Sequence, residues 1–241
     1  MILLVDIGNT RAKFCLCDSG KLTNIHSIDN DLLSETYLQR EFAFVTRVIV
    51  ASVNKPRLLE ILSVWAKANN KKLEEIKTQA NAFGIDCAYR EYQHLGIDRW
   101  VAIIGANKLY PNRNLLIVDA GTALTIDALT ADGQHLGGWI SPGVQTAINA
   151  VLANTTKVFG ERADCNELSF GTATAEGLQQ GCWASVLGSV TLAVNVFEKT
   201  HDNIKLVFTG GDGKVLSDIV SVDSVYHSDL LFCGMSRYVA R

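Results

Sequence analysis

The apolar runs of this chain fall into two series, and the first run of each series opens a similar stretch. LLVDIGNTRAKFCLCDSGKL starts at Leu3, and LIVDAGTALTIDALTADGQHL starts at Leu116. Each stretch has an apolar run, an aspartate, a small turn with Gly and Thr, a second apolar run and a turn that ends in Gly. One ungapped offset separates three pairs of landmarks, namely Asp6 and Asp119, Gly8 and Gly121, and Gly20 and Gly133. The repeat predicts two antiparallel strand meanders whose first turns each carry an aspartate.

Apolar spacing predicts further strands and helices after each meander. The β-branched stretch 45–53 is typical of a strand buried on both faces. Residues 203–213 predict a strand that leads into a glycine turn. Helical spacing is found in four segments, which are 56–70, 98–110, 143–155 and 174–198. Strands followed by helices, twice over, predict an α/β protein with two lobes of similar plan and strands in mixed orientation.

The repeat also predicts where the lobes begin and end. We place the first lobe at residues 1–113 and the second at 114–241, and leave open whether the C-terminal helix packs back on the first lobe. No segment rich in Pro, Gly or Ser separates them, so we expect closely packed lobes. A cleft between two such lobes is a natural place for a ligand.

Composition narrows the class of protein and of partner. The 241 residues are 48 % hydrophobic and 20 % charged, which is typical of a soluble globular protein. The net charge of −3 disfavours nucleic acid as a partner. The first apolar run meets Asp6 at once and is too short for a signal peptide. We therefore expect a cytoplasmic protein whose six cysteines are reduced.

One stretch is long and apolar enough to raise the question of a membrane. Residues 177–197 carry no charge and have the length of a bilayer-spanning helix. The stretch contains Gln, Ser, Thr and Asn side chains, and charged residues flank it. We favour a long helix buried in a core or a subunit interface, and we expect no membrane partner.

The two aspartate turns suggest a binding chemistry. A strand that ends in Asp and turns through Gly presents backbone N–H groups, which bind phosphate oxygens, beside a carboxylate that can hold Mg²⁺. Two such turns would hold a nucleoside triphosphate from both sides. The alternative is that Asp–Gly turns only connect hairpins, and the aligned pair makes us favour phosphate binding. The sequence has no P-loop, no dinucleotide fingerprint, no GxSxG and no zinc-ligand spacing.

Three further motifs are candidates for the site. In HLGIDRW (94–100), Asp98 and Arg99 open a helix after a glycine, although an N-cap aspartate and a surface arginine would look the same. TGGDG (209–213) either allows close approach of an adenine and ribose or is only a turn. GGWISPG (137–143) reads as a Gly/Pro loop that could line a substrate pocket.

The motifs DIGNTRAK, GIDR, DAGTALTID, GGWISPG, GTATAEG and TGGDG occur in this order along essentially the whole chain. In this order and spacing the chain resembles type III pantothenate kinases, which belong to the superfamily of acetate and sugar kinases, Hsp70 and actin. The resemblance implies two duplicated actin-like (ribonuclease H-like) lobes and a homodimer. It also implies ATP-dependent phosphorylation of pantothenate to 4′-phosphopantothenate, the first step of coenzyme A biosynthesis.

The resemblance implies a role for each matching residue. The first phosphate loop would comprise Asp6, Ile7, Gly8, Asn9, Thr10, Arg11, Ala12 and Lys13, with Asp6 holding Mg²⁺ through water. Lys13 either touches phosphate or is a solvated strand residue. The second loop would use Thr122 and Asp119, with Asp119 near a monovalent cation, K⁺ or NH₄⁺.

Pantothenate would be held by Gly96, Ile97, Asp98, Arg99, Tyr89 and Thr174, with Asp98 as the catalytic base and Arg99 suited to the substrate carboxylate. Thr172 and Tyr92 are the alternatives to Thr174 and Tyr89.

Two rival functions stay open at this point. A non-catalytic actin-like nucleotide-binding protein could act as a regulatory or accessory factor, and a phosphatase on the same fold would use water as the acceptor. GIDR separates the first rival from a kinase, because a nucleotide switch needs neither a base nor a carboxylate-binding arginine beside the γ-phosphate.

Overall fold

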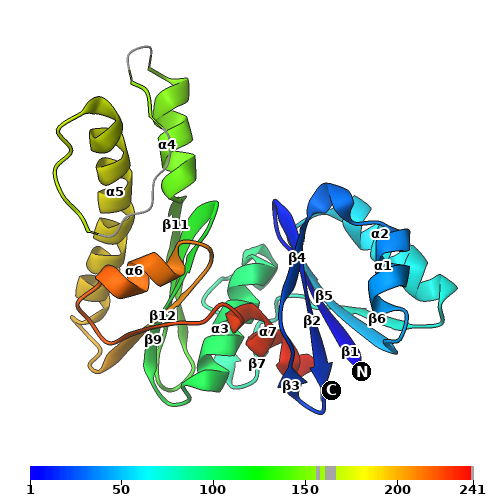
Figure 1. Cartoon of the computed structure of the whole chain (residues 1–241). Coiled ribbons are helices and arrows are strands. Elements are labelled where there is room, and N and C mark those ends of the chain that lie inside the picture. Colours follow the sequence, from blue (N-terminus) through cyan, green and yellow to red (C-terminus); the bar gives the residue numbers. More distant parts are fainter. Residues whose placement is uncertain (156–157, 161–166, 240–241) are drawn as a thin grey trace. The chain divides into compact units, whose positions relative to one another are not determined.

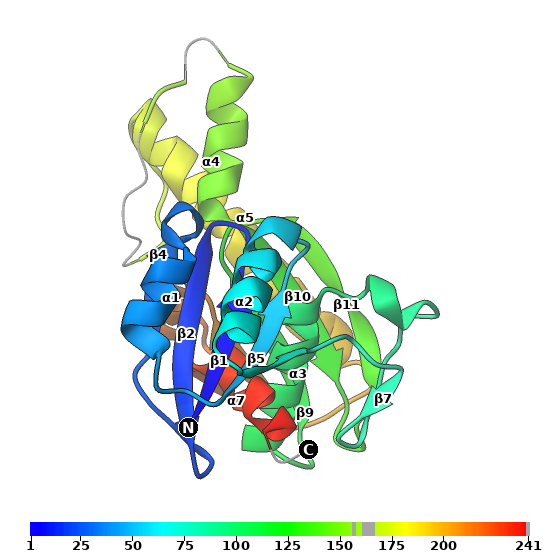
Figure 2. The same cartoon turned by 90° about the vertical axis from the view of Figure 1, so that its right-hand side faces the viewer.

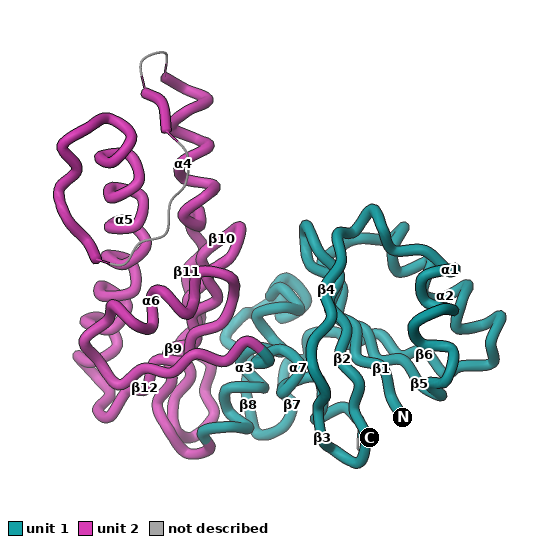
Figure 3. The backbone as a smooth tube through the Cα atoms, in the orientation of Figure 1, with its two compact units in different colours: residues 1–110, 229–241 teal, residues 111–228 magenta. Residues whose placement is uncertain are grey.

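A computed structural model describes residues 1–155, 158–160 and 167–239 (Figure 1). The chain forms two compact units (Figure 3). Unit 1 comprises residues 1–110 and 229–241, and unit 2 comprises residues 111–228. Unit 2 is therefore inserted between the main part of unit 1 and its last helix.

Unit 1 is built on one mixed sheet in the order β3-β2-β1-β5-β6, with β4 paired to β2. Strands β1 and β2 are antiparallel, whereas β5 runs parallel to β1 and to β6. Its elements are β1 Ile2–Ile7, β2 Arg11–Asp18, β3 Lys21–Leu22, β4 His26–Asp29, η1 Asn30–Leu32, α1 Glu35–Phe42, β5 Arg47–Ser52, α2 Pro56–Ala68, β6 Lys72–Glu75, β7 Asn81–Ala82, β8 Ile85–Asp86, η2 Tyr92–His94, α3 Ile97–Leu109, α7 Leu230–Met235 and η3 Ser236–Tyr238.

Unit 2 repeats this plan. Its sheet has the order β11-β10-β9-β12-β13, again with an antiparallel meander followed by parallel strands. The elements are β9 Asn114–Ala120, β10 Ala123–Leu129, β11 His135–Pro142, α4 Val144–Ala153, α5 Thr174–Phe197, β12 Ile204–Thr209, α6 Gly213–Ile219 and β13 Ser224–Tyr226. Two lobes with the same strand order and mixed sheets confirm the predicted fold class.

The register corrects one detail of the repeat. Asp6 pairs with Lys13, whereas Asp119 pairs with Thr125, so the first turn is one residue shorter in the second copy. The following turn is one residue longer, because Cys17 pairs with Leu22 while Leu129 pairs with His135. The two changes cancel, so the offset that looked ungapped in the sequence contains a deletion and an insertion.

The sheet of unit 1 is covered on both faces. Helices α1 and α2 pack on the face that carries Leu3, Val5 and Ile7. Successive side chains of a strand point to opposite faces, so Leu4 and Asp6 belong to the other face. Helix α3 contacts β5 and α7 contacts β1 outside that first core (Figure 2). Asp6 thus lies on the α3 side of the sheet.

Helix α5 is the core helix of unit 2. Among the described residues it is the one helix long and apolar enough to cross a membrane by length and composition alone. The core helix of a globular protein passes the same test, and α5 buries one side against the sheet of unit 2. Its buried residues are Cys182, Trp183, Val186, Val190, Ala193, Val194 and Phe197.

The expectation of a loop at 137–143 is wrong for most of that segment. Residues 137–142 belong to β11, which is the edge strand of its sheet and is paired with β10. An edge strand tolerates Pro142 at its end, because only one side of its backbone needs hydrogen bonds. Gly137 has φ +100 and pairs with Ala128, where the register shifts. A glycine is therefore suited to this position, because the β-bulge needs a backbone conformation that other residues rarely adopt.

The cysteines of the described part of the chain are free thiols. Burial raises the pKa of Cys15, and burial with the nearby Asp229 raises the pKa of Cys233 to about 12. These two thiols therefore stay protonated at neutral pH. Cys165 lies outside the described residues.

Helices α3 and α7 cross where both have a glycine. A Cβ on Gly105 would overlap the carbonyl oxygen of Leu230, and a Cβ on Gly234 would overlap that of Val101. The two backbones are thus in direct contact, which no other residue type allows.

We expect Gly105→Ala to destabilise the protein by about 1–3 kcal/mol, because the added methyl group must push α7 away from α3. Gly177→Ala in α5 is the matched control, since nothing lies within 4 Å of its Cβ position. The control should be neutral or stabilising by up to about 1 kcal/mol, the helix propensity gained over glycine. Urea unfolding of both variants measures this, and equal stabilities would contradict the close crossing.

Candidate active site

The first turn, residues 8–10, connects β1 to β2 and begins two residues after Asp6. The Gly8 N–H donates to the Arg11 carbonyl at 3.0 Å, which closes the turn. Asn9 and Thr10 are exposed, whereas Asp6 is only 5 % exposed. The turn therefore presents backbone to solvent beside a buried carboxylate.

Asn30 holds this turn from the side, and sequence reasoning missed it. Its Nδ2 donates to the carbonyls of Gly8 and Asn9, both at 3.1 Å, and its backbone N–H donates to the Thr10 carbonyl at 3.1 Å. All three carbonyls of the turn are thereby engaged on one side. Backbone N–H groups that face away from such bonds can bind an anion. Only the pairing of β4 with β2 brings Asn30 here, and no motif announces it.

The other residues of the predicted first phosphate loop differ in exposure. Ile7 and Ala12 are fully buried in the core, so only their backbones can serve a ligand. Arg11 is exposed, and its Nε lies 3.4 Å from the Asp29 Oδ1. Lys13 is the cross-strand partner of Asp6, so both side chains are on the same face of the sheet.

Asp98 lies in the first turn of α3. Gly96 is the N-cap, and a Cβ there would come within 2.6 Å of the Asp98 Oδ1. The same oxygen accepts the Arg99 N–H at 2.8 Å. A carboxylate at a helix N-terminus is stabilised by the unpaired N–H groups and the helix dipole.

Hydrogen bonds place this helix start at a defined edge of the sheet. Thr78, just beyond the end of β6, donates its hydroxyl to the Leu95 carbonyl at 2.9 Å. The start of α3 therefore lies at the carboxyl edge of the parallel strands β1, β5 and β6. Asp6 lies at this edge too, near the end of β1, and on the face that α3 covers. The two carboxylates thus share one edge and one face of the sheet of unit 1.

Tyr89 and Arg99 are in contact. The guanidinium Nη1 donates to the Tyr89 hydroxyl at 3.0 Å, and the guanidinium carbon lies 5.7 Å from the centre of the ring. Arg99 is 5 % exposed, so it is not the surface arginine that the alternative interpretation of GIDR expected. The alternative candidate Tyr92 is the first residue of the short helix η2, three residues after Tyr89.

The second turn, residues 121–122, is held by the start of α4. The Thr122 carbonyl accepts the Gly143 N–H at 3.1 Å and the Thr146 hydroxyl at 2.6 Å. A Cβ on Gly143 would overlap the Gly121 carbonyl, so glycine is required there. The Thr122 side chain remains exposed.

Asp119 lies beside the TGGDG segment, with the carbonyl of Ala120 on the same side. Gly210 has φ +85, and a Cβ there would overlap both the Asp119 carboxylate and the Ala120 carbonyl. The Asp212 N–H donates to that carbonyl at 2.9 Å. Burial raises the pKa of Tyr226, and the negative charge of Asp119 raises it further. A carboxylate beside backbone carbonyls is a donor set that suits a hard cation.

The start of α5 separates the two candidate threonines. The Thr172 hydroxyl and N–H both donate to the Glu176 carboxylate, at 3.1 and 3.0 Å. These bonds lower the pKa of Glu176. Thr174 is the first residue of the helix and is exposed. The Thr172 hydroxyl is thus engaged by Glu176, which favours Thr174 as the residue that meets a ligand.

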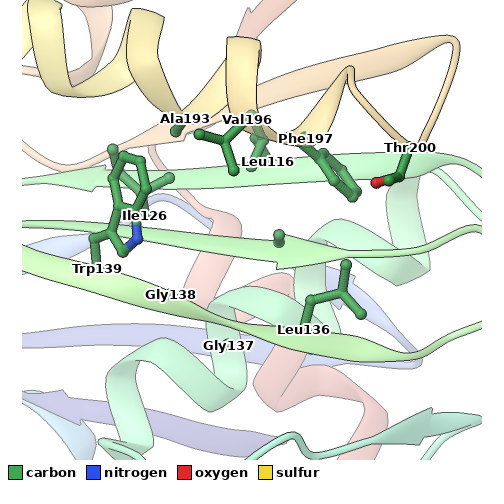
Figure 4. Close-up of a pocket in the computed structure, with 11 residues that line it drawn as sticks. Leu116, Ile126, Leu136, Gly137, Gly138, Trp139, Ala193, Val196, Phe197 and Thr200 are labelled. Carbon is green, nitrogen blue, oxygen red and sulfur yellow. The ribbon is translucent and has the colours of Figure 1, made fainter.

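A pocket of about 210 Å³ lies in unit 2 between the sheet and the end of α5 (Figure 4). Leu136 and Trp139 line it from β11, and Val196 and Phe197 line it from α5. None of the described residues that line it is charged. GGWISPG therefore borders an apolar pocket, which lacks the charged groups that bind phosphate or carboxylate strongly.

Comparisons with known proteins agree with one another. A family model described as type III pantothenate kinase matches residues 2–195. The chain is 35 % identical to the type III pantothenate kinase of Colwellia psychrerythraea, with 99 % of this chain and 100 % of that protein covered. It is also 35 % identical to the type III pantothenate kinase of Idiomarina loihiensis, with 97 % of each covered.

Solved structures show the same fold at lower identity. A protein from Campylobacter jejuni assigned to the Baf family of transcriptional activators has a TM-score of 0.64 at 24 % identity, with 99 % of this chain and 97 % of that chain covered. A protein from Sinorhizobium meliloti assigned as a 2-dehydro-3-deoxygalactonokinase has a TM-score of 0.64 at 12 % identity, with 98 % and 97 % covered. These likenesses establish the fold alone.

We expect Asn30→Ala to weaken the binding of a non-hydrolysable ATP analogue about tenfold, because the turn is no longer pre-organised and about 1.4 kcal/mol is lost. Asn24→Ala, on the exposed loop between β3 and β4, is the matched control and should bind normally. Titration calorimetry measures both. Normal binding by Asn30→Ala would show that the first turn does not contact the nucleotide.

Proposed function

The chain belongs to the type III pantothenate kinase family, and we propose how its residues carry out the phosphorylation of pantothenate. Members of this family are kinases of coenzyme A biosynthesis, which implies ATP as the phosphoryl donor. We assign the γ-phosphate to the first turn and the proton of the substrate hydroxyl to Asp98. The observation that supports this assignment is the position of Asp6 and Asp98 on one edge and one face of the same sheet.

Asp98 is suited to act as the general base. One carboxylate oxygen is oriented by the Arg99 N–H at 2.8 Å, which leaves the carboxylate fixed before the substrate arrives. The primary hydroxyl of pantothenate would give its proton to Asp98 as its oxygen attacks the γ-phosphorus. Phosphoryl transfer depends mainly on such positioning and on charge stabilisation.

The pantothenate carboxylate is assigned to the pair formed by Arg99 and Tyr89. A buried guanidinium interacts with a carboxylate more strongly than an exposed one, because less water screens the charges. Gly96 leaves room for the substrate chain beside Asp98, since a side chain there would meet that carboxylate. The family resemblance adds Thr174 as a further proposed contact with pantothenate.

The proposed cations fit the residues present. Among the described residues, no group of three or more His, Cys, Asp or Glu could hold a metal. A single buried carboxylate such as Asp6 suits Mg²⁺, which keeps several waters and takes its remaining ligands from phosphate oxygens. The ion would neutralise charge between the β- and γ-phosphates. Asp119, with the carbonyl of Ala120 beside it, would hold K⁺ or NH₄⁺.

We expect Asp98→Asn to lower kcat for 4′-phosphopantothenate formation by about 10²–10⁴-fold while the KM for ATP stays the same, because only the proton acceptor is lost. Asp18→Asn, an exposed aspartate at the far end of β2, is the control and should be fully active. Product is measured by mass spectrometry with ATP, Mg²⁺, K⁺ and pantothenate present. Full activity in Asp98→Asn would remove Asp98 from the mechanism.

The same assay tests the cations and the rival function. Replacing K⁺ by Na⁺ should lower the rate of the wild type, and Asp119→Asn should lower the difference between the two salts. A non-catalytic regulatory protein would bind ATP and form no 4′-phosphopantothenate in any salt. The resemblance to the Baf family protein makes this rival worth testing, although that likeness concerns the fold alone.

We further propose a homodimer formed through α5. Leu192 and Val196 lie one turn apart on this helix and are 55 % and 46 % exposed. The hydroxyls of Ser185 and Ser189 donate to carbonyls of their own helix, at 3.0 and 2.9 Å. Because these hydroxyls already have hydrogen-bond partners, burying them costs little, which favours close packing with a second helix.

We expect the wild type to sediment as a dimer and Leu192→Glu to shift it toward monomer, because the introduced charge would be buried at the interface. Leu32→Glu, at an exposed apolar residue of unit 1, is the control and should remain dimeric. Analytical ultracentrifugation over a range of concentrations measures both. A monomeric wild type would contradict the proposal.

A further inference from the structure

The short hairpin that precedes Tyr89 has an unusual turn. Strands β7 and β8 are joined by Phe83 and Gly84, with φ +57 and +78. Two left-handed residues in a row form the tight hairpin turn in which Asn–Gly is strongly preferred. A bulky residue such as phenylalanine is strained in this region. Such strain persists only where the surroundings enforce it.

The enforcing contacts come from the C-terminal segment, residues 236–239. The Arg237 Nη1 donates to the Phe83 carbonyl at 3.4 Å, and its guanidinium carbon lies 4.5 Å from the centre of the Phe83 ring. The Tyr238 ring packs edge-to-face on the same ring, with centres 4.9 Å apart. Phe83 is thus gripped on its backbone and on its side chain.

The C-terminal segment belongs to unit 1 (Figure 3), where side chains of the sheet and of α3 anchor it. Arg47, which forms a bidentate pair with Glu74, also donates to the carbonyls of Val239 and Tyr238, at 2.9 and 3.3 Å. Lys108 of α3 donates to the Ser236 hydroxyl at 2.7 Å. The segment therefore links β5, β6 and α3 to the hairpin.

The same segment contacts α3 at the residue next to Arg99. The indole N–H of Trp100 donates to the Tyr238 hydroxyl at 3.2 Å, and Trp100 directly follows Arg99. On the other side, the Cys87 N–H donates to the Ala80 carbonyl at 2.9 Å and closes the hairpin just before Tyr89. The C-terminal segment thus contacts α3, which carries Arg99, and the hairpin that ends three residues before Tyr89.

We propose that Arg237 and Tyr238 are positioning residues for pantothenate, which act by holding the strained turn at Phe83 and so set Tyr89 against Arg99. This inference rests on the proposed role of that pair. The inference predicts a change in the KM for pantothenate and none in the KM for ATP, because the hairpin is separate from the first turn and from Asn30.

The test compares steady-state constants for both substrates. We expect Arg237→Ala to raise the KM for pantothenate about tenfold and to change the KM for ATP and kcat less than twofold. Arg237→Lys keeps a cation near the ring and should give an intermediate KM. Tyr238→Phe keeps the ring contact and loses the bond to Trp100, so a rise of about threefold is expected, and it serves if Arg237→Ala folds poorly.

Arg40→Ala is the matched control, because Arg40 also lies over a tyrosine ring of unit 1, 5.7 Å from the centre of Tyr37, but belongs to α1 and not to the C-terminal segment. It should leave both KM values unchanged. Phe83→Asn in the Arg237→Ala background is the decisive variant. Asparagine favours the left-handed turn without help, so this double variant should regain most of the pantothenate affinity.

The outcomes separate cleanly. An unchanged KM for pantothenate in Arg237→Ala, or a raised KM that Phe83→Asn does not lower, would overturn the positioning role. A wild type that forms no 4′-phosphopantothenate would overturn the proposed function instead. If the wild type is active and Arg237→Ala raises the KM for ATP as much as the KM for pantothenate, the variant has lost structure in general. That result would also overturn the inference.

Discussion

A backbone turn that binds phosphate must be held in the conformation that presents its N–H groups to the anion, and bonds to its carbonyl groups hold it there. Both turns of the repeat are held through carbonyl groups, and the partners that hold them are unrelated. In unit 1 the amide of Asn30 takes the carbonyls of Gly8 and Asn9. In unit 2 the start of α4, through Gly143 and Thr146, takes the carbonyl of Thr122. The rest of each unit positions these partners.

The duplication therefore preserves the strand order and not the local chemistry. The meanders differ by one residue in each turn, and the cancelling changes keep the later glycines in step. Unit 1 has added the hairpin β7–β8 and the aspartate that begins α3, which serve the acceptor substrate in the proposed mechanism. Unit 2 has added α5, whose buried face forms its core and whose exposed face is the proposed interface.

The sequence was sufficient for the strands and helices whose apolar pattern is strong, such as the meanders, the strand at 45–53 and the helix that begins at Pro56. It failed at GGWISPG, because glycine and proline suggest a loop while an edge strand with a bulge accepts both. It missed Asn30 because a single asparagine that bonds to a distant backbone leaves no pattern. The family resemblance implied that Tyr89 and Arg99 both hold pantothenate, but their contact with each other was not predicted, since nothing in their spacing brings them together.

The order of the elements along the chain has a consequence for biosynthesis. Helix α3 carries the proposed base near its start, and its glycine contact with α7 needs residues that come after the whole of unit 2. At ribosomal speed, on the order of ten seconds separate the synthesis of the two helices. During that time unit 2 can fold, whereas unit 1 is without the helix and C-terminal segment that complete it. In the nascent protein, unit 1 is therefore completed last, after unit 2, although most of unit 1 is synthesised first.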